Sequence, residues 1–504
     1  MRVVNLTTAS VTLTLKDGTS SDVVIEGGSF ATQINLIGTT SAGSILGGGG
    51  TDTVTLTSNA SATAINLGNG NNQVTLSQDA VAGTVVGGDG TDSVTLSGNA
   101  SATSINVGNG GFGGWNPVQT VTLSDNARVG SIVCGNGVDQ VTLSGNARAT
   151  VIDLGDNVSN SSQIVLLQDA ASATTILGGG GVDRVLLFGS GSAHVTTITL
   201  GSNSDTVSIA NASAWNPGIT IDGGSSSDRL ELGGSGIYDL RTATLTGIEY
   251  LGLGNGTVAL VDDGTLDGFS NLSGGAASRI ETAEASLDLT GISLTGATAH
   301  SSNTVGTTFT ADNKATALQV FGGSGTDTLQ ATSLTFTALE REAIFALTSI
   351  ETIVDASGYY GNDLANTIIG DAGANIIEGG DGNDRLAGGG GSDSLSGGAD
   401  ADTFVFTSES DGTDTIKDFV TGLDVIEIAA AGFGGGLWAG MDVATVFDVS
   451  SDGNFGSSAI RFHFDTLTDT LYFDADGSAA GSAAVALATF SNNLALDSGD
   501  FVVV

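Results

Sequence analysis

Short apolar runs recur through the first half of the chain at intervals of 20 residues or slightly more. In the best copies the run is Val-Thr-Leu, at residues 54–56, 74–76, 94–96, 121–123 and 141–143. Looser copies follow at Ile164, Val185, Val207 and Leu230. Because successive side chains of a strand point to opposite faces, the valine and leucine would face inward and the threonine outward. A repeat of this length is typical of a solenoid, so the pattern predicts stacked β-coils over residues 45–235.

Each coil contains a second apolar run, at residues 65–67, 85–86, 105–107, 132–134 and 152–154. Aligning these runs predicts an inward column formed by Leu67, Val86, Val107, Cys134 and Leu154. A cysteine in such a column would be a buried and unreactive thiol. Between the two runs stands a turn of small residues, such as Ser-Asn-Ala-Ser-Ala-Thr, which contains no stacked carboxylate.

A shorter repeat occupies residues 361–405, which divide without a gap into five units of nine residues. The eighth position is always apolar, and the sixth is always Asp or Asn. Glycines fill most of positions one, two and four, as a tight turn with positive φ requires. Two units would make one coil of two short strands and two turns. We therefore expect Asn366, Asp384 and Asp402 to stack on one edge, and Asn375 and Asp393 on the other.

Stacked carboxylates repel one another unless a cation lies between them. Calcium suits such turns because it takes six to eight oxygens from carboxylates and backbone carbonyls. The alternative is a solvated linker rich in Gly and Asp, which five units in one frame disfavour. The candidate ligands in this segment are Asp363, Asn366, Asn375, Gly379, Asp381, Gly382, Asp384, Gly388, Gly390, Asp393, Gly397, Ala399 and Asp402.

The same type of turn recurs on one edge of the longer coils, at residues 47–52, 87–92, 178–183 and 223–228. Weaker copies end at Asn72, Asp139 and Asp205, and a further full copy lies at residues 322–330. The alternative for this edge is a glycine turn capped by an aspartate side chain. The candidate calcium ligands here are Asp52, Asn72, Asp89, Asp92, Asp139, Asp183, Asp205, Asp228 and Asp327.

Residues 236–357 are less regular. The segments Gly-Ile-Glu-Tyr-Leu (247–251) and Ser-Ile-Glu-Thr-Ile (349–353) look like one strand motif used twice. The best candidate for a helix is residues 338–347, with Leu339, Ile344, Phe345 and Leu347 as its apolar residues. Residues 1–44 are predicted to be strands that could serve anchoring or assembly.

The composition is strongly acidic, with 54 Asp and Glu against 13 Lys and Arg and a formal net charge of −41. Nucleic acid is therefore not an expected partner, since phosphates need Lys and Arg. Cys134 is the only cysteine, so no intrachain disulfide can form. No apolar run is long enough to span a membrane. The first ten residues lack the apolar core of a signal peptide.

The nonapeptide segment resembles the repeats-in-toxin (RTX) family of secreted bacterial proteins. Residues 414–419, 422–427 and 471–477 resemble the strands that close the roll in RTX proteases and lipases. The final residues, Asp500 followed by Phe501 and three valines, resemble an uncleaved signal for type I secretion; the alternative is an ordinary last strand. The resemblance implies calcium as the cofactor, the type I secretion apparatus as a partner, and a secreted, extracellular or cell-surface location.

Together these observations predict an all-β fold: a right-handed parallel β-solenoid with coils of about 20 residues, then an RTX β-roll and a β-rich cap. The expected parts are residues 1–44, 45–235, 236–357, 358–405 and 406–504.

No catalytic motif is found. The three histidines, His194, His300 and His463, are far apart in the sequence, and neither H-E-x-x-H nor G-x-S-x-G occurs. We therefore expect a structural protein rather than an enzyme. It would assemble with itself into a surface layer, matrix filament or adhesive coat, with a cell-surface polysaccharide as a further candidate partner.

Two alternatives stay open. One is a β-helix enzyme that acts on a polysaccharide with an unrecognised pair of carboxylates. The other is an ice- or surface-binding adhesin that uses the outward threonine column, which breaks at Val165. Its members are Thr55, Thr75, Thr95, Thr122 and Thr142.

Overall fold

The computed structural model describes residues 2–7, 9–18, 23–109, 118–156, 162–189, 194–492 and 494–504. The insertion at residues 111–117 lies outside them. The chain forms two compact units. Unit 1 comprises Met1–Glu281 with Ile292–Thr298, and unit 2 comprises Thr282–Gly291 with Ala299–Val504. In the described part of the chain, no helix combines the length and the apolar character needed to cross a membrane.

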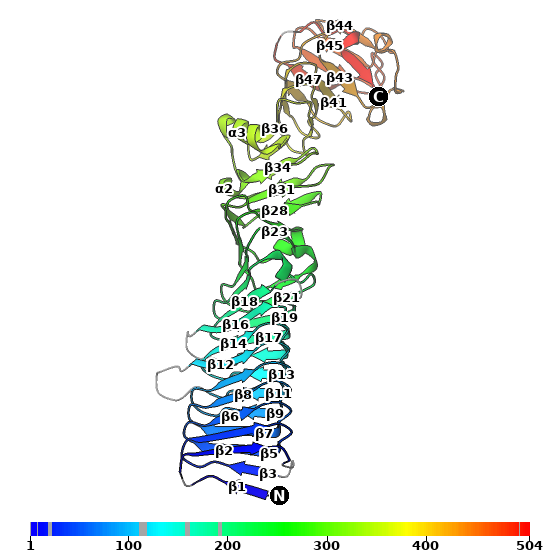
Figure 1. The fold of residues 1–504 in the computed structure, drawn as a ribbon. Helices are drawn as coiled ribbons and strands as arrows, with labels where there is room; N and C mark the ends of the chain where they lie inside the picture. The colour runs from blue at the N-terminus through cyan, green and yellow to red at the C-terminus, as the bar shows by residue number, and fades with distance from the viewer. Residues whose placement is uncertain are drawn as a thin grey trace. The chain divides into compact units, whose positions relative to one another are not determined.

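Two long parallel sheets run through unit 1, and successive coils contribute one strand to each (Figure 1). The first contains, among the described residues, β1 (Arg2–Asn5), β3 (Val23–Glu26), β5 (Ser41–Gly49), β7 (Ser61–Asn69), β9 (Val81–Val86), β11 (Ser101–Asn106), β13 (Arg128–Val133), β15 (Arg148–Asp153), β17 (Ser172–Gly180), β19 (Val195–Ser202), β21 (Thr220–Asp222) and β24 (Thr244–Thr246).

The second contains β2 (Val11–Lys16), β4 (Thr32–Ile37), β6 (Thr53–Leu56), β8 (Gln73–Leu76), β10 (Ser93–Leu96), β12 (Val118–Leu123), β14 (Val138–Leu143), β16 (Ser162–Asp169), β18 (Val182–Gly189), β20 (Thr206–Ile209), β22 (Arg229–Leu232), β25 (Tyr250–Leu253), β27 (Asn271–Gly274) and β30 (Ser293–Thr295). The strands of residues 1–44 thus join the same two sheets as the coils that follow. Unit 1 also holds β23 (Gly236–Asp239), β26 (Thr257–Leu260), β28 (Arg279–Thr282) and the short helix α1 (Asp263–Leu266).

The core of unit 1 is built from identical side chains stacked in register. Val54 pairs with Val74 and Leu56 with Leu76, and all four are fully buried. The threonine between them faces outward and is half-buried. The β-branched and leucine side chains fit such a pleated surface. The predicted parallel β-solenoid is therefore confirmed.

One predicted inward column needs a correction. Leu67, Val107, Cys134 and Leu154 are buried as expected, but Val86 is half-exposed. In the register of β9 and β11, Val86 pairs with Asn106, which faces outward. Gly87 takes the inward position instead. In the second strand of a coil, residues such as Ile65 and Leu67 face inward. The apolar run at 85–86 has only two residues, so the sequence did not show which of them faces inward.

The small-residue turn on the opposite edge satisfies its own polar groups. Asn99 donates to Asp79 (2.9 Å), Asn126 to Asn99 (3.1 Å), and Asn146 to Asn126 (3.2 Å). Fully buried alanines, such as Ala100, fill the inside of this corner. Side-chain amides therefore bridge successive coils on this edge.

Unit 2 contains two further sheets. The larger has, in the described residues, the order β29 (Ser286–Asp288), β32 (Thr308–Thr310), β34 (Thr328–Ala331), β35 (Thr352–Asp355), β36 (Gly358–Gly361), β38 (Ile376–Asp381), β40 (Ser394–Ala399), β42 (Asp414–Ile416), β47 (Val485–Phe490), β46 (Thr470–Phe473), β45 (Phe462–Asp465) and β44 (Phe447–Ser450). The smaller has the order β37 (Thr367–Ile369), β39 (Arg385–Ala387), β41 (Thr403–Phe406), β43 (Val425–Ile428) and β48 (Phe501–Val503). β31 (Thr298–Ser301) pairs with β33 (Val320–Phe321), and α2 spans Lys314–Ala317.

The predicted helix exists as α3, Ala338–Thr348, and begins with a capping box between Thr337 and Glu340. Its buried face differs from the prediction: Ile344 is buried, but Leu339 and Leu347 are about three-quarters exposed (74% and 73%). The spacing of the apolar residues predicted a wider buried face than the one that α3 has in the structure.

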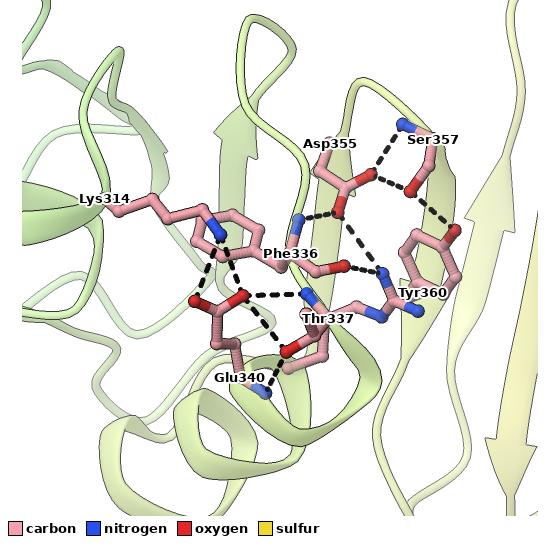
Figure 2. A network of polar contacts seen from close by, with 8 residues as sticks. Lys314, Phe336, Thr337, Glu340, Asp355, Ser357 and Tyr360 are labelled. Atoms are coloured by element: carbon pink, nitrogen blue, oxygen red, sulfur yellow. Dashed lines mark hydrogen bonds and ion pairs between the residues drawn. The ribbon is translucent and has the colours of Figure 1, made fainter.

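A polar network joins α3 to the hairpin of β35 and β36 (Figure 2). Asp355 accepts hydrogen bonds from the Phe336 N–H (2.9 Å) and the Ser357 hydroxyl (2.5 Å). Arg341 donates to Phe336 O (2.7 Å) and lies over the Tyr360 ring. Burial opposes ionisation of Asp355, but these hydrogen bonds and the charge of Arg341 hold its pKa below the usual value. The network fixes the antiparallel hairpin from which the nonapeptide segment starts.

Candidate calcium-binding turns

The five nonapeptides alternate between the two sheets of unit 2. β37, β39 and β41 pair in parallel in one sheet, with Ile368, Leu386 and Phe404 in one inward column. β38 and β40 pair in the other, with Ile377 against Leu395. Units one coil apart therefore lie directly above one another, as the sequence predicted.

On one edge the sixth-position side chains form a hydrogen-bonded stack. The Asn366 N–H donates to Asp384 Oδ1 (2.7 Å), and the Asp384 N–H donates to Asp402 Oδ1 (2.9 Å). The Asp402 N–H then donates to Asp424 Oδ1 (2.9 Å). The expected stack is present, and Asp424 extends it.

The other edge repeats this arrangement. The Asn375 N–H donates to Asp393 Oδ1 (2.7 Å), and the Asp393 N–H donates to Asp414 Oδ1 (3.0 Å). Asp418 belongs to the first edge, where it accepts from the N–H groups of Gly397 and Gly398 in the turn of Asp402. The sequence analysis did not include Asp414, Asp418 or Asp424 among the candidates. Asp414 and Asp424 each stand two residues before a buried isoleucine, the same offset as in the repeats, which could have revealed them.

Two of the stacked aspartates use one oxygen for the preceding coil and leave the other buried without a donor, whereas Oδ2 of Asp424 accepts the Val420 N–H. Oδ2 of Asp384 and of Asp393 has no hydrogen-bond partner, although these residues are only 1% and 2% exposed. Burial raises the pKa of Asp384 to about 6, and that of Asp402 and Asp414 to about 7, with nearby carboxylates adding to the effect. A buried carboxylate oxygen without a donor is costly, and a bound cation would remove that cost.

Glycine backbone surrounds these oxygens. Gly380 and Gly382 adopt φ values of 111° and 109°, which only glycine takes readily. At Gly379, the first position of that turn, an added side chain would collide with the Asp384 carboxylate and with Gly397 O. The turns thus bring carboxylate and carbonyl oxygens close together with no side chain between them, and oxygen ligands of this kind fit calcium.

The remaining candidates lie in the same turns but outside the buried stacks. The side chains of Asp363 and Asp381 are exposed, and Asp381 acts on Asp384 only through its charge. Gly388, Gly390, Gly397 and Ala399 can offer only backbone carbonyls. No three His, Cys, Asp or Glu side chains converge on one point in the described ranges. Any ion bound here would therefore need carbonyl oxygens as well as carboxylates.

A family model for the RTX calcium-binding nonapeptide repeat matches residues 360–395 and 379–413. Residues 360–413 are RTX calcium-binding repeats. Comparison with curated proteins gives no match to the chain. The stacked carboxylates described above all lie within or directly after these RTX repeats.

In unit 1 the expected aspartates also form one column, outside the matched RTX repeats. Its members, in coil order, are Asp52, Asn72, Asp92, Gln119, Asp139, Gln163, Asp183, Asp205 and Asp228, all buried. Asp89 is exposed beside this column. The side chains of Gln119 and Gln163 were missed, although each stands two residues before a core valine, as Asp52 does.

The two glutamate motifs have the same role in the two units. The Asp228 N–H donates to Glu249 Oε2 (2.8 Å), and the Asp327 N–H donates to Glu351 Oε2 (2.7 Å). Asp327 itself accepts from the Thr307 N–H (2.7 Å). The repeated strand motif of residues 247–251 and 349–353 therefore marks a coil in which glutamate replaces aspartate as the acceptor.

A buried histidine lies in the cap that follows the RTX repeats. His463 Nδ1 is 2.7 Å from Asp448 Oδ1, and Nε2 is 3.5 Å from Ser450 Oγ. The Ser450 hydroxyl lies 2.5 Å from Asp452 Oδ1, to which it donates. The serine proton is thus not directed at the histidine, and the distance exceeds that of a nucleophile and its base. We assign this cluster to packing of the cap.

Proposed function

We propose that this chain is a secreted calcium-binding structural protein. It forms a cell-surface layer, an extracellular matrix filament or an adhesive coat through calcium-dependent folding and self-assembly. The observation that carries the proposal is the pair of carboxylate stacks in the RTX repeats, in which Oδ2 of Asp384 and of Asp393 is buried without a donor. Calcium bound there stabilises only the folded state, so its binding free energy becomes folding free energy.

Charge and open strand edges support self-assembly. A net charge of −41 keeps subunits apart until cations neutralise it. Among the described strands, β1 pairs only with β3, and β2 only with β4, so each leaves one edge without a partner. An unpaired edge invites another chain. We propose that the N-terminal strands lie at a subunit contact or at the anchoring surface, where they would contact a cell-surface polysaccharide.

Secretion is supported by the resemblance of the chain end to a type I signal. In the structure these residues form β48, which pairs with β43 in the sheet that carries three of the five nonapeptide strands. Phe501 and Val503 are buried. We propose that the type I apparatus acts on the unfolded chain, and that β48 pairs once calcium outside the cell orders the roll.

The test is a calcium titration of the purified chain, followed by light scattering and electron microscopy. We expect monomers in chelator and ordered sheets or filaments in the millimolar range of calcium typical of extracellular sites. Scattering that stays monomeric throughout, at high protein concentration, overturns the assembly proposal. A screen on uronate polymers would then test the enzyme alternative.

A further inference from the structure

Two arginines lie side by side on the outer face of the first sheet of unit 1. Arg128 in β13 pairs with Arg148 in β15, so the two residues stand directly opposite each other in neighbouring strands, which lie about 4.8 Å apart. Both side chains are exposed. Five other coils have serine or valine at this position, namely Ser41, Ser61, Val81, Ser101 and Ser172. The arginine pair therefore interrupts a column of mostly small side chains.

The arginine pair has no carboxylate partner. Among the described residues, neither Arg128 nor Arg148 takes part in an ion pair, although the chain has 54 Asp and Glu. The nearest acidic residues in the sequence, Asp125 and Asp153, each accept a backbone N–H (2.9 Å in both). Like charges directly opposite each other on a sheet are destabilising. The stability of the coils therefore does not account for the pair.

An open hollow of about 380 Å³ lies beside the two arginines. In the register of the sheet, Gly130 stands between Thr103 and Thr150 and leaves a gap in the row of outward side chains. A methyl group at Gly130 would lie 2.4 Å from Thr103 O. The volume is within the range of roughly 300–1,000 Å³ that small-molecule sites have. Four hydroxyl groups line the hollow, those of Ser101, Thr150, Ser172 and Thr174.

The lining determines which ligand chemistry fits. A guanidinium group keeps its charge and presents a planar fork of N–H donors, which matches the two oxygens of a carboxylate. A serine or threonine hydroxyl both donates and accepts hydrogen bonds, as the hydroxyls of a sugar ring do. A uronic acid unit of a polysaccharide carries one carboxylate and several ring hydroxyls. This unit therefore matches both the arginine pair and the hydroxyls around it.

A carboxylate on a second copy of this chain is the alternative occupant. Its aspartate or glutamate side chain would reach the guanidinium groups, but it has no hydroxyls to match those that line the hollow. Repulsion by the net charge of −41 acts on either partner, and it is largely screened beyond about 8 Å at physiological salt. Local complementarity therefore decides between the two, and it favours the saccharide.

We propose that Arg128 and Arg148 form a binding site for an acidic saccharide. Both guanidinium groups hold the carboxylate of a uronic acid unit, and the neighbouring serine and threonine hydroxyls bind its ring hydroxyls. This site deepens the proposed function, on whose polysaccharide partner it rests, because it fixes the chemical class of the saccharide. It requires no contact between subunits.

The test is calorimetric titration of the full chain in calcium and about 0.15 M salt, at a concentration where light scattering shows a monomer. The probes are trimers of galacturonate, glucuronate and mannuronate, the neutral trisaccharide maltotriose, and a triglutamate peptide with blocked ends. We expect at least one uronate trimer to bind, maltotriose not to bind, and triglutamate to bind at least about ten-fold more weakly. Binding of none of the uronates, or equal binding of triglutamate, overturns the proposal.

Substitution of the arginines assigns the binding to the pair. Arg128→Ser and Arg148→Ser restore the residue type that the same position has in other coils, and each should weaken binding about ten-fold through loss of a charged hydrogen-bonding group. The matched control is Arg184→Ser, which removes an exposed arginine from the other sheet of unit 1 and should leave the affinity unchanged. Unchanged affinity in both pair variants, or an equal loss in Arg184→Ser, overturns the proposal.

Two further measurements keep the outcomes distinct. Circular dichroism shows whether each variant folds, and Arg148→Lys, which keeps the charge but loses the planar fork, should also weaken binding if a serine variant does not fold. Full affinity in a folded Arg148→Lys contradicts the bidentate contact. Light scattering in calcium reads assembly separately. A chain that stays monomeric but binds uronate contradicts assembly alone, and a chain that assembles without binding uronate contradicts this site alone.

Discussion

A stacked aspartate offers two oxygens with different surroundings. Oδ1 of Asp384 accepts the N–H of the preceding coil, as a capping residue does. Oδ2 is buried and has no donor. The first oxygen defines the turn and is needed with or without metal, whereas the second makes the turn unstable until a cation or a proton arrives. The same side chain therefore holds the turn in place through one oxygen and makes its stability depend on a cation or a proton through the other.

Asp384→Asn should separate these two roles. The amide keeps an acceptor for the Asn366 N–H but removes a charged ligand, so we expect the calcium concentration at half-maximal folding to rise about ten-fold, as a loss of about 1.4 kcal/mol would produce. The matched control is Asp400→Asn, an exposed residue with φ of 75°, a conformation that asparagine tolerates. Circular dichroism during a calcium titration measures both. Equal shifts in the two variants would contradict a specific role for Asp384.

Protons should partly replace calcium. Burial raises the pKa of Asp384 to about 6 and that of Asp402 to about 7, from a usual value of 3.8. A group whose pKa is higher in the folded state takes up protons on folding, so stability falls as the pH rises from 3.8 through 6 and 7. In chelator we therefore expect more β-structure near pH 5 than near pH 8, and calcium should remove the difference. The opposite pH dependence would show that these carboxylates are not the destabilising groups.

The strands and turns show how much the sequence alone could predict. The repeat spacing predicted the stacked coils, the inward Val and Leu columns and the two stacks of the RTX repeats, because a strand has a period of two and identical coils align. Val86 was placed wrongly because its run had only two residues. The antiparallel pairing of β35 and β36 could not be predicted, since it depends on a hairpin and on the network around Asp355.

The candidate site was predicted in part. The aspartates of the nonapeptide motif were found, but Gln119 and Gln163 do not fit that motif and reach the column only through the register of β12 and β16. The sequence also could not show which carboxylate oxygens lack a donor, because this depends on which of the two oxygens accepts the backbone N–H. A motif search detects the ligand type, whereas the coil register decides which side chains meet.

Two glycines of one turn should respond differently to alanine. A methyl group at Gly47 would lie 2.5 Å from Leu67 O and 2.6 Å from Asp52 Oδ2, whereas at Gly49 the nearest atom would be 3.8 Å away. We expect Gly47→Ala to lower the free energy of unfolding of unit 1 by about 1–3 kcal/mol through overpacking. Gly49→Ala should be neutral or slightly stabilising. Denaturant midpoints compare the two, and equal midpoints would contradict the close approach of neighbouring turns.

The charge of the complete chain connects folding with assembly. A formal charge of −41 opposes contact between subunits, and the carboxylates that calcium would neutralise are part of that charge. General screening would weaken the long-range repulsion but would not satisfy the buried oxygens, because screening acts mainly on exposed charges. Calcium would therefore have two effects: it orders the turns and permits contact.

Sodium chloride at matched ionic strength should not replace calcium. We expect scattering to remain that of a monomer in chelator with added sodium chloride, and to rise when calcium is supplied at the same ionic strength. The ions differ in charge density and in their affinity for carboxylate oxygen. Assembly in sodium chloride alone would mean that screening suffices and that the calcium turns are not what controls it.

The central claim is that calcium binding supplies the folding free energy of the RTX repeats. Hydrogen exchange of residues 361–405 in the full chain, with chelator and with saturating calcium, tests it most directly. We expect amides of this segment to exchange almost as fast as an unfolded chain in chelator and to become strongly protected in calcium, because ordering its glycines is costly without the ion. Equal protection in both conditions would contradict the account.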